Sequence, residues 1–160
     1  WALSFDGNKP GQPQPFIKRP SIQQIAEFSP DGHWVAYDSD ESGRHEVYVE
    51  PYPGPGSKTQ VSTDGGLRPL WNRNGRELFY RNGEKLMSVD VTTQSRFTAG
   101  KPRMLFELRT RQSFHDYGVT PDGQRFMMIR RAVEETEPKQ INIILNWFED
   151  LKQRLAAQKK

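Results

Sequence analysis

The stretch FSPDGHWVAYDSD, residues 28–40, places the turn signal Pro30-Asp31-Gly32 between two apolar segments. Asp-Gly pairs readily adopt the positive φ angles that a tight turn between antiparallel strands requires. The pattern therefore predicts a strand on each side of the turn. Whether this hairpin is isolated or is one copy of a repeat decides the fold.

The turn signal recurs in NRNGRELFYRN, residues 72–82, and in TPDGQRFMMIR, residues 120–130. The three turn glycines, Gly32, Gly75 and Gly123, are 43 and 48 residues apart. In each copy an apolar residue precedes the turn and a short apolar strand follows it. Other segments with period-two alternation predict further strands in each copy. Four short strands in roughly 45 residues are typical of a β-propeller blade.

The sequence therefore predicts an all-β chain that forms one domain. This domain is a partial β-propeller of about three four-stranded antiparallel blades, followed by a short C-terminal α-helix. The expected parts are outer strands of a preceding blade (1–20, with 6–15 as their loop), two blades (21–63 and 64–110), a partial blade (111–146) and the helix (147–158). The helix is expected because Trp147, Leu151 and Leu155 recur with helical spacing.

Composition excludes several classes of function. The net charge is +3 and the basic residues are scattered, so no basic stripe indicates nucleic-acid binding. The chain has no Cys, which excludes a disulfide, a thiolate nucleophile and a Cys-ligated zinc site. No apolar run is long enough for a membrane span. The chain begins with Trp1 and has no signal-peptide pattern, so we expect a fragment or a processed product.

Residues 28–56, from FSPDG to YPGPG, resemble the TolB-like propeller repeat, in which an aromatic-Ser-Pro-Asp-Gly turn precedes a VAY strand. VSTDGGLRPLWNRNGRELFY (61–80) and INIILNWFEDLKQRL (141–155) are similar to the C-terminal propeller part of bacterial receptor-like serine/threonine kinases. The resemblance covers about residues 11–155. The second turn departs from the pattern, because it reads Asn-Arg-Asn-Gly.

The resemblance implies a sensor or scaffold role and an extracytoplasmic location, either periplasmic or at the cell surface. Kinase activity is not implied, because the chain lacks the glycine-rich phosphate loop and the H-R-D and D-F-G motifs. Similar propellers also accompany serine peptidase domains of the prolyl-oligopeptidase type, so the resemblance leaves a hydrolase connection open.

Five residues are candidates for catalysis. Ser113, His115 and Asp116 lie together in SFHDYG, but neighbouring strand residues face opposite sides, so Asp116 is expected to face away from the other two. Asp40 and Glu41 belong to an acidic group after the first turn, with Asp38 and Glu46. These carboxylates could serve as a glycosidase pair or bind calcium, or they form a polar loop on the rim.

No metal site is predicted, because the three histidines lack a zinc-binding spacing, and no cofactor is expected apart from the calcium alternative. The candidate ligand-binding residues are His45, Tyr48, Tyr52 and Arg68. The two tyrosines are expected to be exposed at the rim, where aromatic side chains make good binding anchors. Six other aromatic residues are expected in the core between blades: Phe28, Trp34, Tyr37, Trp71, Phe79 and Tyr80.

Closed propellers have about four to eight blades, and an open stack would leave unpaired strand edges. We therefore expect either a homodimer that closes a six-bladed ring, or upstream blades in a longer chain. The predicted function is a non-catalytic module that binds a protein or a small-molecule ligand. The alternatives are a hydrolase of the glycosidase, esterase or peptidase type, with its site in the channel or at a subunit junction, and an excised fragment that folds by self-association.

Overall fold

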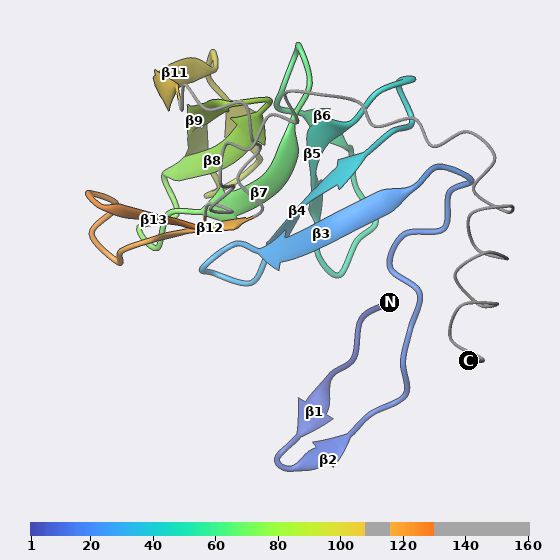
Figure 1. Cartoon of the computed structure of the whole chain (residues 1–160). Coiled ribbons are helices and arrows are strands. Elements are labelled where there is room, and N and C mark those ends of the chain that lie inside the picture. The colour runs from blue at the N-terminus through green and yellow to red at the C-terminus, as the bar shows by residue number, and fades with distance from the viewer. Residues whose placement is uncertain (108–115, 130–160) are drawn as a thin grey trace, which may run out of the picture.

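The computed structural model describes residues 1–107 and 116–129, and these form thirteen β-strands and no helix (Figure 1). The prediction of an all-β chain is confirmed for this part. The helix expected at 147–158 lies outside the described residues, as does most of the partial blade expected at 111–146. Within the described ranges no helix is long and apolar enough to cross a membrane.

The first sheet is an antiparallel meander of four strands. They are β3 (Gln23–Phe28), β4 (Trp34–Ser39), β5 (Glu46–Pro51) and β6 (Thr59–Gln60), hydrogen-bonded in that order. The predicted turn at residues 29–33 joins β3 to β4. A second turn at residues 40–45, which includes Gly43 at φ 90°, joins β4 to β5. The two-residue β6 is the fourth strand of the blade predicted at 21–63.

The second sheet repeats this meander with a divided outer edge. Its strands are β7 (Leu67–Trp71), β8 (Glu77–Asn82), β9 (Lys85–Thr92), β10 (Thr98–Ala99) and β11 (Arg103–Glu107). The eight-residue β9 is long enough to pair with β11 along its first half and with β10 at its end. The β8–β9 turn contains Gly83 at φ 58°, as its Asn-Gly pair predicts.

Two hairpins complete the described chain. The third sheet consists of β12 (Asp116–Val119) and β13 (Phe126–Ile129). At the N-terminus, β1 (Phe5–Asp6) pairs with β2 (Lys9–Pro10), and the ladder continues to a bridge between Ala2 and Gln14. The expected loop over residues 6–15 is wrong, because the chain turns tightly at Gly7, whose φ is 58°.

The three repeated turns have the same local geometry. In each, the first residue's carbonyl oxygen accepts a hydrogen bond from the glycine amide: Ser29 to Gly32 (2.8 Å), Asn72 to Gly75 (2.9 Å) and Thr120 to Gly123 (2.8 Å). The glycine φ angles are 73°, 69° and 72°. The residue before each glycine also accepts a hydrogen bond, through its side-chain oxygen, from the backbone amide of the residue after the glycine. The three pairs are Asp31 and His33, Asn74 and Arg76, and Asp122 and Gln124. Asparagine therefore replaces aspartate in the second turn without changing the turn.

The sheets stack face to face (Figure 1). The buried side chains of the core lie between them. Alternate residues of β4 point to opposite faces, so Ala36 packs toward the second sheet whereas Val35 and Tyr37 face the other way. The first interface joins Ala36, Val47, Val49 and Val61 to Trp71, Leu78, Tyr80, Val89, Val91 and Phe97. The second interface joins Phe79 and Leu86 to Tyr117, Val119, Phe126 and Met128.

The predicted aromatic core is largely confirmed. Trp71, Phe79 and Tyr80 are buried between sheets, and Trp34 is partly buried against the first interface. Tyr37 is buried too, but on the outer face of the first sheet rather than between sheets. The prediction for Phe28 is wrong, since 53% of this residue is exposed. Phe28 is on the outer face of the first sheet, and in the described chain no further sheet covers that face.

Leu78 tests the interface between the first two sheets, because it is fully buried there. We expect Leu78→Ala to lower the free energy of unfolding by about 2–5 kcal/mol, since it leaves a cavity between packed sheets. The control Met104→Ala, at a residue that is 52% exposed, should change it by less than about 0.5 kcal/mol. Urea denaturation measures both, and equal effects would contradict the stacked core.

Candidate functional site

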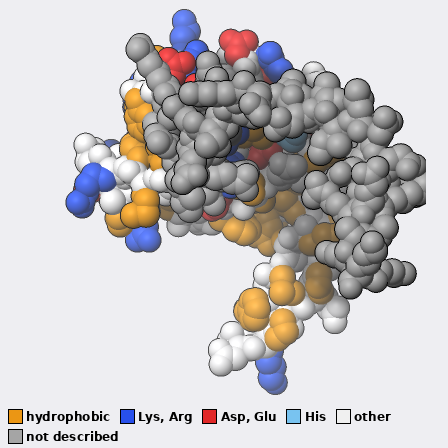
Figure 2. Space-filling view, in the orientation of Figure 1, with side chains coloured by type: hydrophobic (Ala, Val, Ile, Leu, Met, Phe, Trp, Pro, Cys, Tyr) orange, Lys and Arg blue, Asp and Glu red, His pale blue; other side chains and the backbone are white. Residues whose placement is uncertain are grey.

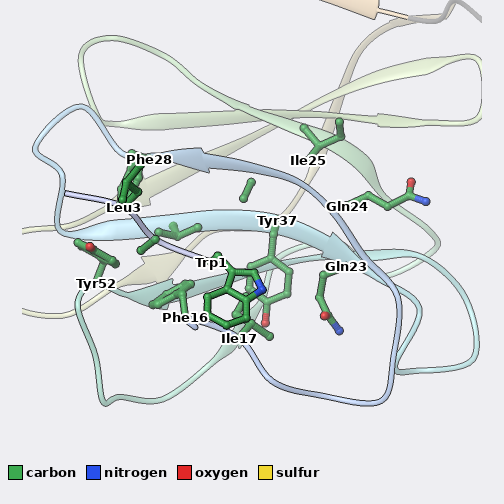
Figure 3. A pocket seen from close by; sticks show the side chains of 13 residues that line it. Trp1, Leu3, Phe16, Ile17, Gln23, Gln24, Ile25, Phe28, Tyr37 and Tyr52 are labelled. Atoms are coloured by element: carbon green, nitrogen blue, oxygen red, sulfur yellow. The ribbon is translucent and has the colours of Figure 1, made fainter. Parts of the chain in front are cut away.

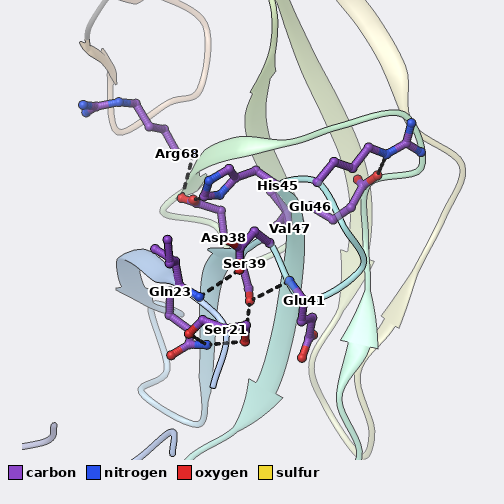
Figure 4. A network of polar contacts seen from close by, with 12 residues as sticks. Ser21, Gln23, Asp38, Ser39, Glu41, His45, Glu46, Val47 and Arg68 are labelled. Atoms are coloured by element: carbon purple, nitrogen blue, oxygen red, sulfur yellow. Dashed lines mark hydrogen bonds and ion pairs between the residues drawn. The ribbon is translucent and has the colours of Figure 1, made fainter. Parts of the chain in front are cut away.

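Two of the predicted ligand-binding residues contact one buried carboxylate, His45 through its ring and Arg68 through its backbone amide (Figure 4). Asp38 is near the end of β4, away from the turn at residues 29–33. Its Oδ2 is 3.2 Å from Nδ1 of His45, and its Oδ1 accepts a hydrogen bond from the backbone amide of Arg68 at 3.3 Å. Asp38 thus connects the first sheet to the first strand of the second.

The environment of Asp38 disfavours its charged form. The side chain is completely buried, and this burial raises the pKa of the carboxyl group. The Arg68 amide and His45 oppose the shift but do not cancel it. The His45 side chain is 33% exposed, so a buried carboxylate holds an imidazole that solvent can reach. Such a carboxylate fixes the orientation of the ring through one nitrogen.

Residues from three sheets meet at this place. Arg68 has a φ of 55°, and its carbonyl oxygen accepts a hydrogen bond from the hydroxyl of Tyr117 on β12 at 2.7 Å. Burial lowers the pKa of Arg81 on β8, and the neighbouring Arg68 lowers it further. We call Asp38, His45, Arg68, Arg81 and Tyr117 the His45 cluster. Asp38 and Tyr117 contact the backbone of Arg68, whose side chain points away from Asp38 and His45 (Figure 4) and lies close enough to Arg81 to lower its pKa.

The other two predicted ligand-binding residues lie elsewhere. Tyr48 is only 3% exposed and packs against Tyr37, so its expected exposure is wrong. Tyr48 lies opposite Tyr37 on the outer face of the first sheet, and the Lys58 side chain lies over its ring. Tyr52 is partly exposed, and its ring packs edge-on against Phe16 and Phe28.

The acidic residues after the first turn do not converge. Asp40 accepts a hydrogen bond from the Ile22 amide at 2.8 Å, and Glu41 forms an ion pair with Lys58. Glu46 is buried and pairs with Arg44 at 2.7 Å. Each carboxylate therefore has its own structural partner. Among the described residues no group of three or more His, Cys, Asp or Glu side chains could hold a metal ion.

Of the predicted Ser-His-Asp group, Ser113 and His115 lie outside the described residues. Asp116 begins β12, where its backbone pairs with that of Ile129. A triad at these three positions stays a prediction.

An apolar hollow of about 500 Å³ lies between the N-terminal segment and the outer face of the first sheet (Figure 3). Trp1, Phe16, Phe28 and Tyr52 are among the side chains that line it. Beside it, the segment before β3 is held to the sheet by Arg19, which donates hydrogen bonds to Glu50 at 2.6 Å and to the Tyr37 hydroxyl at 2.9 Å. The Tyr37 hydroxyl also donates to Glu50.

Arg81 and Tyr117 are members of the His45 cluster that sequence reasoning did not single out. A usable signal for Arg81 exists in the repeat, because Asp38 and Arg81 both lie six residues after their turn glycine. A charged residue at the same position of two otherwise apolar strands indicates a shared polar site. Tyr117 gives no such signal, since its contact with Arg68 depends on how the second and third sheets stack.

A comparison with protein-family models and with curated proteins finds no match to this chain. What can be inferred about function therefore depends on the residues and their geometry.

Asp38 gives a prediction with a defined pH dependence. Its pKa is raised in the folded state, so the proton it binds stabilises the fold at low pH, and this contribution is lost as the pH rises through the folded pKa. The free energy of unfolding of wild type, compared with that of Asp38→Asn, should therefore rise as the pH falls toward the ordinary pKa of an aspartate. Urea denaturation across pH measures the difference, and a difference independent of pH would contradict a raised pKa.

The control for this experiment is Asp38→Ala. It removes the acceptor of the Arg68 amide, and it should lower the free energy of unfolding by about 1–3 kcal/mol at neutral pH. Asp38→Asn keeps an acceptor oxygen of the same shape and should cost clearly less than Asp38→Ala.

Glu50 should show the opposite pH dependence. Burial alone would raise its pKa, but hydrogen bonds from Arg19 and Tyr37 outweigh burial and lower it. Its stabilising contribution is complete above the unfolded pKa and is lost as the pH falls through the folded pKa. Glu50→Gln should therefore cost about 1 kcal/mol at neutral pH and progressively less in acid. Glu107→Gln, at an exposed position of β11, should show no such trend in the same titration.

Proposed function

We propose that the three sheets are consecutive blades of a β-propeller of the TolB-like type. The repeated turn geometry and the face-to-face stacking of meander sheets both support this arrangement. The first strands of the first two sheets, β3 and β7, are neighbours, as the inner strands of adjacent blades would be. In such a fold the inner strands surround a central channel.

We further propose that the chain is a non-catalytic binding module, of the sensor or scaffold kind, whose site is the His45 cluster. The observation that carries this proposal is the convergence of polar groups from all three sheets at one end of the stack. The neighbouring side chains of Arg68 and Arg81 and the imidazole of His45 outnumber the carboxylate of Asp38, and this balance favours a ligand that carries carboxylates. An acidic segment of a protein and a small organic acid both present this chemistry.

A hydrolase is the second candidate, and the Asp38–His45 pair is the observation that favours it. A carboxylate that orients an imidazole is the arrangement a general base requires. In the described part of the chain, however, the His45 ring is hydrogen-bonded to Asp38 and not to a serine hydroxyl. Among these residues the pair therefore lacks the nucleophile that an acyl-transfer mechanism needs.

Binding of model peptides tests the proposed function. A tetraglutamate peptide should shift the NMR resonances of His45 and Arg68, whereas a tetralysine peptide should not. Arg68→Gly keeps the backbone amide that Asp38 accepts from and suits the positive φ angle. It should weaken tetraglutamate binding by roughly tenfold, which corresponds to one lost charged contact.

The control is Arg73→Gly, at an exposed position of the second repeated turn, which should leave peptide binding unchanged. Fluorogenic ester, glycoside and peptide substrates distinguish the second candidate. Turnover that His45→Ala abolishes would favour the hydrolase over the binding module.

A further inference from the structure

The outer face of the first sheet exposes side chains whose equivalents in the second and third sheets are buried. Phe28, Trp71 and Val119 each precede the first residue of a repeated turn. Trp71 is 5% exposed and donates a hydrogen bond from Nε1 to the Glu27 carbonyl at 3.1 Å. Val119 packs against the second sheet. In the second and third copies this position is therefore covered by the preceding sheet, whereas Phe28 in the first copy is 53% exposed.

The second strand of each sheet follows the same rule. Leu78 and Tyr80 on β8 pack against the first sheet, and Phe126 and Met128 on β13 pack against the second. Their counterparts on β4 are Val35 and Tyr37, which meet the short segment at Phe16 and Ile17 instead of a sheet.

We call the outer face of the first sheet the leading face. It carries Ile25, Phe28, Val35, Tyr37 and Tyr52, all of which line the apolar hollow (Figure 3). The N-terminal hairpin extends from this side of the molecule (Figure 1), and hydrophobic side chains lie on its surface (Figure 2). Trp1, Leu3 and Phe5 are exposed in this segment.

At the opposite end of the stack, the outer face of the third sheet also exposes a residue whose equivalents in the other sheets are buried. Met127 on β13 occupies the repeat position of Ala36 and Phe79. Ala36 is fully buried and Phe79 is 1% exposed, because in each case the next sheet covers them. Met127 is 77% exposed. We call this outer face of the third sheet the trailing face.

We propose that the leading face of one copy of this chain binds the trailing face of a second copy, so that two copies stack head to tail. In residues 1–107 and 116–129, both junctions between sheets join a trailing face to a leading face, and the two faces left without a neighbouring sheet are the separate halves of that same junction. Three sheets from each of two copies make six, which is within the range of about four to eight blades in closed propellers. A head-to-tail contact that closes in this way leaves neither face exposed. This inference rests on the proposed propeller.

The repeat also indicates which residues meet across the new junction. Trp71 and Ala36 belong to the same core cluster between the first and second sheets. By equivalence, Phe28 of one copy should approach Met127 of the other. The exposed side chains at both positions make substitutions there compatible with folding of the single chain.

Sedimentation equilibrium across micromolar concentrations tests the inference. Wild type should have twice the 18.5 kDa mass of one chain. Phe28→Asp and Met127→Asp should each weaken the dimer by roughly tenfold or more, because each damages both junctions. Gln94→Asp, which adds the same charge at an exposed position, should leave the mass unchanged. A wild type with the mass of one chain at every concentration overturns the proposal.

A mixture of the Phe28→Asp and Met127→Asp variants distinguishes two arrangements of the dimer. In one, the leading face binds a trailing face, and in the other, two leading faces bind each other. A pair made of one Phe28→Asp copy and one Met127→Asp copy keeps one undamaged junction, so mixing should restore a two-chain species. A dimer that resists Met127→Asp, or a mixture that stays dissociated, overturns the head-to-tail arrangement. Near-ultraviolet circular dichroism checks that each variant keeps the wild-type fold.

Cysteine cross-linking provides a readout that does not depend on weakened association. The chain has no Cys, so Phe28→Cys and Met127→Cys each introduce a single thiol. A short bismaleimide should link a mixture of the two variants and should link neither variant to itself. Linkage within the Phe28→Cys variant alone overturns the proposal. If the ring fails these tests while tetraglutamate still binds the His45 cluster, the inference falls and the proposed function stands.

Discussion

The burial of apolar faces between successive sheets is the constraint on which the rest of this structure depends. No single sheet has an apolar interior of its own, since a sheet of two to five short strands is only one layer thick. Ala36, Val47 and Val49 leave water only because Leu78, Tyr80 and Val89 oppose them. The same dependence recurs between the second and third sheets. Stability therefore comes from neighbours in the stack, as in repeat proteins generally.

This dependence explains where polar groups gather. Stacking brings the ends of β4 and β7 together, and it carries Asp38 into a buried position between the first two sheets. The His45 ring and the Arg68 amide then supply partners for a carboxylate that burial would otherwise make costly. Tyr117 reaches Arg68 from the third sheet. The His45 cluster is thus a product of the stack, and a repeat taken alone could not form it.

Much of the fold could be predicted because it rests on local rules. The turns at Gly32, Gly75 and Gly123 follow from residues that tolerate a positive φ, and the flanking alternation follows from the two-residue period of a strand. Exposure was harder to predict. Tyr48 and Phe28 lie on the same outer face of the first sheet, yet one is 3% and the other 53% exposed. The difference depends on side chains that cover Tyr48, such as Tyr37 and Lys58, and sequence spacing carries no record of those contacts.

The sequence by itself therefore determined the strands, the three equivalent turns and their repetition, because each of these depends on the conformational preferences of a few adjacent residues. It also indicated His45 and Arg68 as candidate ligand-binding residues. Only the tertiary structure decided that these two residues share Asp38, that Asp40 and Glu41 have separate partners, and that Phe28 and Met127 lie on open faces. The physical reason is that contacts between sheets join residues about 30 to 60 positions apart, and their geometry follows from how whole layers pack rather than from any local pattern.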